Sequence, residues 1–262
     1  MAVQSSPSGY GPWAPRGHGL GVFFAPTLLA MRVSFLVDGF NLYHSVKSAE
    51  RHTQAGPLRW LDVHGLCSTL LRSTFGPGAS LEGVYYFSAL AKHLEAWKPD
   101  VVRRHRTFIS ALESKGVQVS LANFKRKDRY EVLSRCRLRV EPFRKWWRIP
   151  VPRIRLSFRT HEEKETDVAI ACKLLELLHR NQCDTAVLLT GDTDIAPAIR
   201  TAQQLFPRAT VCVAFPFDRH NRDLERQASK SLKIGAALYQ RHQLPPTIQL
   251  KSGRLIAKPA SW

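Results

Sequence analysis

Two sequence patterns alternate along the chain, and this alternation restricts the fold more than any other feature. Short runs rich in β-branched and aromatic residues predict buried strands, and longer segments with apolar residues at helical spacing follow them. Predicted strands occupy residues 32–37, 81–88, 117–121, 185–189 and 210–215. Predicted helices occupy residues 42–49, 61–73, 98–114, 165–179, 195–205 and 218–229, and Asn41 is placed to cap the first. Strands that alternate with helices predict an α/β fold in which a mostly parallel central sheet has helices on both faces.

The alternation stops at about residues 123–160, which we interpret as a basic, aromatic insertion. The sequence VPRIRLSF within it alternates in polarity and predicts a β-ribbon in part. Arginine and lysine side chains can contact phosphates while aromatic rings stack on bases, so the segment suits single-stranded RNA. A small subsidiary core with solvated arginines explains the same composition, and both interpretations stay open. The proposed substrate-binding residues here are Lys125, Arg126, Lys127, Trp146 and Trp147.

One domain, residues 31–243, accounts for the alternating pattern. Residues 1–30 are rich in Gly, Pro and Ser without periodicity, and Met31 directly precedes the first strand. We therefore expect residues 1–30 to be a disordered extension that can lie upstream of the true start. Residues 244–262 contain proline and predict an irregular C-terminal tail.

The charge balance points to a polyanionic partner. The chain has 39 Lys and Arg against 21 Asp and Glu, a formal net charge of +18. A solvated basic surface gives the same total, but the clustering of the basic residues favours nucleic acid. The short apolar stretch at 20–30 cannot span a bilayer, so no membrane partner is expected. Five cysteines without CxxC spacing predict neither a disulfide framework nor a zinc site, and a cytoplasmic location is the simplest expectation.

Four aspartates fall where strands end or helices begin. Asp38 ends the first predicted strand, and Asp192 and Asp194 follow the fourth. Asp167 lies in the first turn of the helix after the insertion. Because strand ends and helix starts of a parallel sheet face one edge, we expect these carboxylates to approach one another.

Clustered carboxylates raise one another's pKa unless a cation neutralises them, and oxygen ligands select Mg²⁺ or Mn²⁺ over zinc. Such an ion can activate water and orient a phosphate. Asn41 and Thr190 are polar neighbours that could contact the substrate. Each acid also has an ordinary explanation as a turn residue, a helix cap or a charge that complements a helix dipole; we expect Asp194 in particular to cap the following helix.

Three short motifs in this order resemble those of NYN domains, which are PIN-like ribonucleases, and the LabA-like branch is the most similar. The motifs are DGFN at 38–41, KETDV at 164–168 and TGDTD at 190–194, and the resemblance extends over about residues 32–240 and into the tail. The resemblance implies a three-layer PIN-like Rossmannoid fold, a divalent metal ion and hydrolysis of RNA phosphodiester bonds. Carried over by position, the catalytic and metal-binding acids would be Asp38, Asp167 and Asp192, with Asp194 as a further metal-binding acid.

Two departures from that family pattern leave an alternative open. Many relatives carry another Asp where this chain reads LKIGAA at 232–237, and many LabA-like members have paired cysteines where this insertion has Cys136 alone. The leading hypothesis is a metal-dependent ribonuclease, and the alternative is an RNA-binding regulatory protein with a weak or inactive site. A phosphatase of the haloacid dehalogenase type needs an Asp-x-Asp pair, which residues 38–40 lack. The sequence leaves open whether the protein forms a homodimer.

Overall fold

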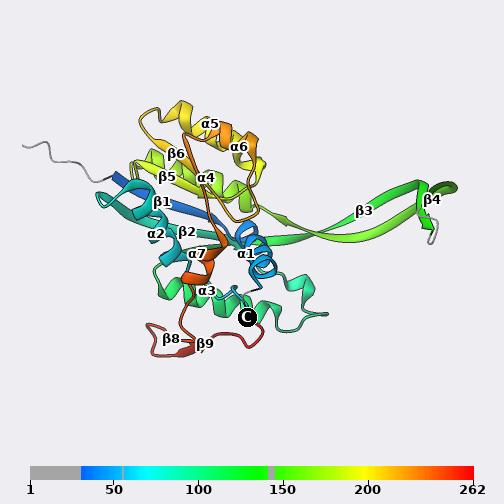
Figure 1. Cartoon of the computed structure of the whole chain (residues 1–262), viewed down its shortest axis with the longest axis horizontal. Coiled ribbons are helices and arrows are strands. Elements are labelled where there is room, and N and C mark those ends of the chain that lie inside the picture. The colour runs from blue at the N-terminus through cyan, green and yellow to red at the C-terminus, as the bar shows by residue number, and fades with distance from the viewer. Residues whose placement is uncertain (1–30, 55, 141–144) are drawn as a thin grey trace, which may run out of the picture.

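The computed structural model describes residues 31–54, 56–140 and 145–262, and for residues 123–164 it describes the backbone alone. Figure 1 shows a central sheet with helices above and below it. The extension expected at residues 1–30 lies outside the described residues. None of the helices in the described ranges combines the length and the apolar character needed to cross a bilayer.

Six parallel strands form the central sheet, in the order β3-β2-β1-β5-β6-β7, and β4 extends it at the β3 edge. β4 runs antiparallel to β3. This arrangement confirms the predicted mostly parallel sheet. The strands are β1 (Met31–Asp38), β2 (Ala79–Ala89), β3 (Gln118–Val140), β4 (Lys145–Lys164), β5 (Thr185–Leu189), β6 (Thr210–Phe215) and β7 (Lys230–Lys233).

Helices cover both faces of the sheet, which confirms the three-layer architecture. One face carries α1 (Gly39–Thr53), α2 (Val63–Phe75), α3 (Val101–Ser114) and α7 (Ala236–Arg241). The other carries α4 (Thr166–His179), α5 (Ala196–Leu205) and α6 (Arg222–Gln227). Two short 3₁₀ helices, η1 (Lys92–Leu94) and η2 (Thr193–Ile195), lie in the connections.

Alternate side chains of the inner strands enter two separate cores. In β1, Phe35 and Val37 belong to the core under α1 and α2, whereas Leu36 belongs to the core under α4 and α5. In β5, Leu189 belongs to the core under α1 and α2, and Leu188 belongs to the core under α4 and α5. Strands buried on both faces have continuous apolar sequences, which explains why these runs do not alternate in polarity.

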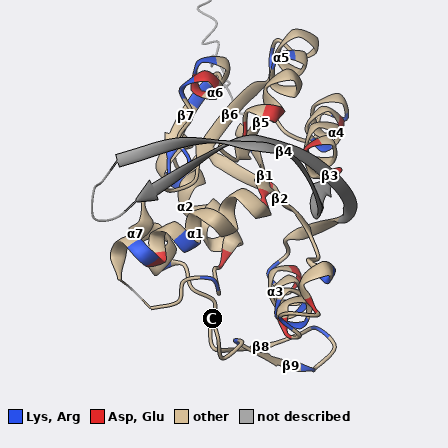
Figure 2. Cartoon of the chain, turned by 90° about the vertical axis from the view of Figure 1, so that its right-hand side faces the viewer, with Lys and Arg blue, Asp and Glu red and all other residues tan. Residues whose placement is uncertain are grey.

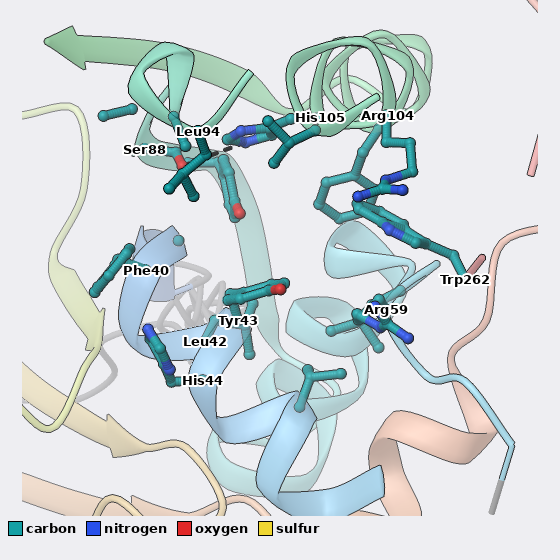
Figure 3. A pocket seen from close by; sticks show the side chains of 18 of the residues that line it. Phe40, Leu42, Tyr43, His44, Arg59, Ser88, Leu94, Arg104, His105 and Trp262 are labelled. Atoms are coloured by element: carbon teal, nitrogen blue, oxygen red, sulfur yellow. Dashed lines mark hydrogen bonds between the residues drawn. The ribbon is translucent and has the colours of Figure 1, made fainter. Parts of the chain in front are cut away.

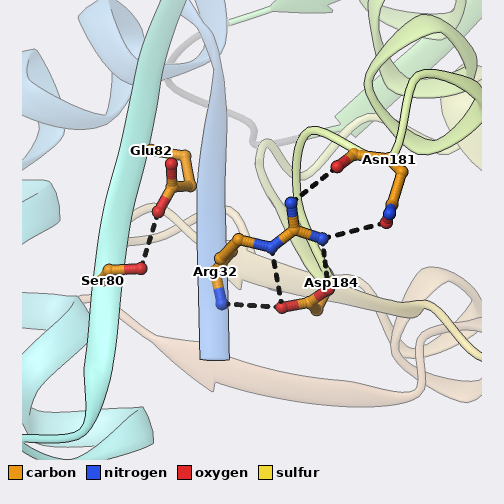
Figure 4. A network of polar contacts seen from close by, with 5 residues as sticks. All are labelled: Arg32, Ser80, Glu82, Asn181 and Asp184. Atoms are coloured by element: carbon orange, nitrogen blue, oxygen red, sulfur yellow. Dashed lines mark hydrogen bonds and ion pairs between the residues drawn. The ribbon is translucent and has the colours of Figure 1, made fainter. Parts of the chain in front are cut away.

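A polar network joins strands at the amino edge of the sheet (Figure 4). The guanidinium of Arg32 donates to both carboxylate oxygens of Asp184, at 2.7 and 3.2 Å, and to the backbone oxygen of Asn181 at 2.7 Å. The backbone N–H of Arg32 also donates to Asp184 at 2.9 Å. These contacts fix the start of β1 against the turn before β5, so the two strands reach the carboxyl edge in register.

Beyond the sheet, β3 and β4 continue as a two-stranded ribbon. β2 pairs with β3 only as far as Ala89 and Ala122, and β3 then pairs with β4 from Asn123 opposite Lys164. Figure 1 shows the ribbon extending away from the helices. The sequence predicted a β-ribbon for only part of this segment, because much of it lacks a clear alternation of polarity. Its role as a basic, RNA-binding insertion stays a prediction.

The C-terminal segment is more ordered than its irregular sequence indicates. It forms a small antiparallel hairpin from β8 (Thr247–Gln249) and β9 (Leu255–Ala257). The indole N–H of the buried Trp60 donates to the carbonyl of Pro245 at 2.8 Å, and Trp262 packs edge-on against Trp60 and Phe108. These contacts join residues distant in sequence, so local periodicity does not reveal them.

Candidate active site

Asp38 lies at the carboxyl end of β1 with only 5% of its surface exposed. One carboxylate oxygen accepts the backbone N–H of Asn41 at 2.9 Å, and the other accepts the hydroxyl of Thr190 at 2.9 Å. The prediction that Asn41 caps the helix was wrong: α1 begins at Gly39, so Asp38 is the N-cap. The side chain is thereby held in one orientation at the sheet edge.

Thr190 and Asn41 connect the ends of the two central strands. The hydroxyl of Thr190, which donates to Asp38, accepts the backbone N–H of Asp192 at 3.1 Å. The side-chain oxygen of Asn41 accepts the N–H of Gly191 at 3.2 Å. Both residues therefore lie at the acidic edge, where they bind its backbone and carboxylate groups, and their contact with a substrate stays a prediction.

Asp192 and Asp194 lie in the turn that follows β5. The carboxylate of Asp192 accepts the backbone N–H of Asp194 at 3.1 Å, which makes Asp192 the N-cap of η2. The interpretation of Asp194 as the cap was therefore wrong, because a 3₁₀ turn intervenes before α5. Asp194 is exposed in that turn.

Asp167 lies in the first turn of α4 and is half-buried. Burial, and after it the charges of Asp192, Asp38 and Asp194 in that order, together raise the pKa of its carboxyl to about 6. The fold has therefore brought four acids from three segments into one electrostatic neighbourhood. Figure 2 views this side of the molecule and shows acidic segments close to β1 and β5.

The donor chemistry of this group fits a hard divalent cation, because all four side chains offer carboxylate oxygens that repel one another. The geometry is more open than a finished metal site. Among the side chains that the structure describes, those of residues 31–54, 56–122 and 165–262, no three His, Cys, Asp or Glu are gathered closely enough to hold an ion. Charge acts on a pKa over longer distances than coordination spans, so the two observations agree.

Gly191 allows a loop from the next strand to approach the acidic turn. A Cβ at this position would lie 2.1 Å from the carbonyl oxygen of Arg219, which follows β6. The charge of Arg219 also acts on α1: the pKa of His44 is lowered by burial first and then by the charges of Arg219 and Lys47. Sequence reasoning missed Arg219, since no motif or spacing connects it with residues 190–194.

A cavity of about 400 Å³ lies beside the acids, with α1 on one side and α3 and the segment after β2 on the other (Figure 3). Its lining includes Phe40, Tyr43, Ser88, Arg104 and His105. None of these belongs to the site residues predicted from the sequence, except that Phe40 is part of the motif at 38–41. The exposed aromatic residues near the start of α1 were the signal that could have indicated it.

The substrate-binding residues predicted in the insertion cannot be placed relative to the acids. The side chains of Lys125, Arg126, Lys127, Trp146 and Trp147 lie outside the described ones, which leaves their roles as predictions. The backbone of β4 ends at Lys164, three residues before Asp167, so the ribbon is joined directly to the acidic edge.

The chain matches a known protein family. The family model of the NYN domain matches residues 32–235. No curated protein matches the chain. A solved structure of a protein of unknown function from Vibrio parahaemolyticus is similar, at 15% identity and a TM-score of 0.48, over 80% of this chain and 96% of that one.

Proposed function

The chain belongs to the NYN domain family, part of the PIN-like nuclease superfamily, and from this premise we propose that it is a divalent-metal-dependent ribonuclease. The reaction would be hydrolysis of RNA phosphodiester bonds at the carboxyl edge of the sheet. The observation that carries the proposal is the raised pKa of Asp167, to which burial and three neighbouring aspartates contribute. Acids kept together at such a cost are typical of functional sites.

The ion would be Mg²⁺ or Mn²⁺, held by Asp38, Asp167, Asp192 and Asp194. When bound, it would supply an activated water and stabilise charge on the phosphate. Asp38 is held by two hydrogen bonds and Asp192 by one, from the backbone N–H of Asp194, whereas Asp194 itself is exposed in the turn. Asp38 would therefore set the position of the site, and the other acids would close around it.

The remaining residues would orient these acids and the substrate. Thr190 holds the second carboxylate oxygen of Asp38, and Asn41 holds the acidic turn through the N–H of Gly191. An isolated buried carboxylate is costly, and hydrogen bonds of this kind keep it ionised. Loss of either residue would misplace an acid without removing its charge.

We propose single-stranded RNA as the substrate, with the basic residues of the ribbon as a further contact surface. The motifs that resemble the LabA-like branch support assignment to that branch. A cytoplasmic location is proposed because the chain has five cysteines without a disulfide pattern, and Cys67, Cys172, Cys183 and Cys212 are free. A homodimer is proposed as a second form of the protein, to be checked by light scattering.

The test is cleavage of end-labelled RNA by Asp38→Asn and Asp192→Ala, with Mn²⁺ or with EDTA. Both variants should lose at least about 100-fold in rate, as expected when a preorganised charge is removed from an active site. Asp223→Ala on α6, where Asp223 pairs with Arg226, is the matched control and should retain activity. Melting curves establish that each variant is folded. Unchanged cleavage by folded Asp192→Ala would refute the proposal.

The second candidate is an RNA-binding regulatory protein with a weak or inactive site. It is favoured by the absence of an assembled ligand group among the described side chains and by the lack of an acid at residues 232–237. Binding of RNA in EDTA, with no cleavage when either metal is added, would establish this function. Metal-stimulated cleavage that Asp192→Ala abolishes would exclude it.

A further inference from the structure

The cavity beside the acids shares an element with them. Asp38 ends β1 and caps α1, and the next two residues, Gly39 and Phe40, already line the cavity. Consecutive Cα atoms are about 3.8 Å apart, so the cavity begins within one nucleotide of the acidic edge. A strand of RNA with its phosphate at the acids would have an adjacent nucleotide at the mouth of the cavity.

Aromatic rings on α1 form an accessible wall. Phe40 is 47% exposed and Tyr43 is 39% exposed, although both lie next to an apolar core. The imidazole of His44 stands edge-on to both rings, with centroids 4.6 Å from Phe40 and 5.5 Å from Tyr43. Exposed aromatic faces one turn apart are what nucleobases stack on in single-stranded complexes.

The far side of the cavity supplies polar groups that suit the edge of a base. Ser88 is buried at the end of β2, and its hydroxyl lies 3.4 Å from the Nε2 atom of His105 on α3. Burial lowers the pKa of His105 to about 4, so the ring is neutral at physiological pH. A neutral imidazole and a hydroxyl each donate and accept hydrogen bonds, as the edges of nucleobases require.

Arg104 gives the cavity a cation. It lines the cavity from α3 and forms no ion pair with any described side chain, whereas the neighbouring Arg59 is paired with Glu50 at 3.0 Å. Figure 3 shows Arg104 at the rim, near Trp262. Arg103 and Arg106, on the same helix, line a different hollow, and Arg103 is paired with Asp100 at 2.6 Å. Arg104 is therefore placed to meet a phosphate.

We propose that this cavity is a nucleobase subsite, which takes one unstacked base of the RNA strand next to the scissile phosphate. The base stacks on Tyr43 and Phe40 and meets Ser88 and His105 with its polar edge, while Arg104 binds the adjoining phosphate. The volume of about 400 Å³ lies within the usual range of about 300–1,000 Å³ for ligand sites. The inference rests on the proposed function in one respect, namely that the bound RNA strand is the substrate.

The test is binding of fluorescent 12-mer RNAs in EDTA, in which one nucleotide at a time is replaced by an abasic residue. Wild-type protein should lose about tenfold in affinity at one position, as expected when one stacked base is removed. Tyr43→Ala should lose about as much on intact RNA and become insensitive to that abasic position. Tyr43→Phe should keep the wild-type pattern, since it keeps the ring.

Arg104→Ala and Arg106→Ala form a matched pair, because each removes one positive charge from α3. Weaker binding by Arg104→Ala alone supports the subsite. Equal losses in both variants show that α3 contributes only general charge and overturn the proposal. An abasic series without a sensitive position, or a mononucleotide that binds as tightly as the RNA, overturns it as well. Because no metal is present, these results are independent of whether the protein cleaves RNA.

Discussion

The raised pKa of the Asp167 carboxyl shows that gathering the four aspartates has an electrostatic cost. Burial and three nearby aspartates raise its pKa from 3.8 to about 6 in the folded chain. A group whose pKa is raised on folding contributes stability below its unfolded pKa and loses that contribution as pH rises through its folded pKa. At neutral pH without metal, the ionised carboxylate of Asp167 therefore lowers the free energy of unfolding of the chain.

We predict that Asp167→Asn will be more stable than wild type in EDTA at pH 7.5. A shift of about two units corresponds to about 3 kcal/mol, and solvent screening of a half-exposed side chain reduces the expected gain to about 1 kcal/mol. Urea unfolding measures this difference, and it should disappear near pH 4, where Asp167 is largely protonated in the folded state.

Asp184→Asn gives the opposite control. The Arg32 guanidinium lowers the pKa of Asp184, so its contribution is present above the unfolded pKa and is lost as pH falls through the folded one. This variant should be less stable than wild type at pH 7.5. A gain for Asp167→Asn that persists at pH 4 would contradict the electrostatic explanation.

At the scale of elements, the first turn of α1 serves two surfaces. Its N-cap, Asp38, belongs to the acids, while Phe40 and Tyr43 line the cavity. The β3–β4 ribbon serves the same edge from another direction, because β4 leads into α4 and Asp167. Beyond Ala122 the ribbon's backbone pairs only with itself, so its pairing is independent of the sheet.

We predict that replacing residues 125–162 by Asn-Gly will preserve the fold. Phe124 is paired with Glu163, and a two-residue Asn-Gly turn can close that pair as a hairpin. RNA affinity should fall at least tenfold. The logarithmic salt dependence of binding should weaken by about 0.7 for each phosphate that the ribbon neutralises in the wild-type complex. Anisotropy titrations at several salt concentrations measure both effects.

Arg222→Ala with Arg226→Ala on α6 is the control for general charge and should change affinity much less than the ribbon deletion. Circular dichroism and thermal melting establish that the shortened chain is folded. Wild-type affinity in that folded chain would show that the ribbon does not bind RNA, and Lys125, Arg126, Lys127, Trp146 and Trp147 would then lose their proposed role.

Across the whole molecule, the two edges of the sheet differ in whether their acidic side chains are paired with basic ones. At the amino edge, Asp184 is matched by Arg32. At the carboxyl edge, four aspartates stand together in a chain of net charge +18. The basic surface would attract a polyanion over long range, and the local excess of carboxylates would attract a cation. An RNA phosphate and a metal ion are therefore expected to stabilise one another's binding.

We predict that Mn²⁺ will stabilise the folded chain by mass action. At about 100 times its dissociation constant, an ion that binds only the folded state adds about 2.7 kcal/mol, which is about 5–10 °C in melting temperature for a domain of this size. Differential scanning calorimetry with Mn²⁺ and then EDTA measures the shift. Asp192→Asn should lose most of it, and Asp223→Asn should keep it. Equal shifts in both variants would place the ion elsewhere.

The sequence alone determined the α/β architecture and the edge to which Asp38, Asp167 and Asp192 belong. Those features follow from local periodicity and from the rule that parallel strands end at one edge. The sequence did not determine which residue caps each helix. Asp38 rather than Asn41 caps α1, and Asp192 rather than Asp194 is the cap in the turn after β5, where it caps η2. Those roles depend on where each helix begins, which shifts by a residue or two without changing the pattern.

Only the tertiary structure decided what surrounds the acids. Tyr43 and Arg104 line one cavity although about sixty residues separate them, and Arg219 packs against Gly191 from the end of another strand. Trp262 packs against Trp60 although about 200 residues separate them. Periodicity reports only which side of an element is buried. Which elements then meet is set by the packing of the complete sheet and its two helical layers, and the cavity exists only where they meet.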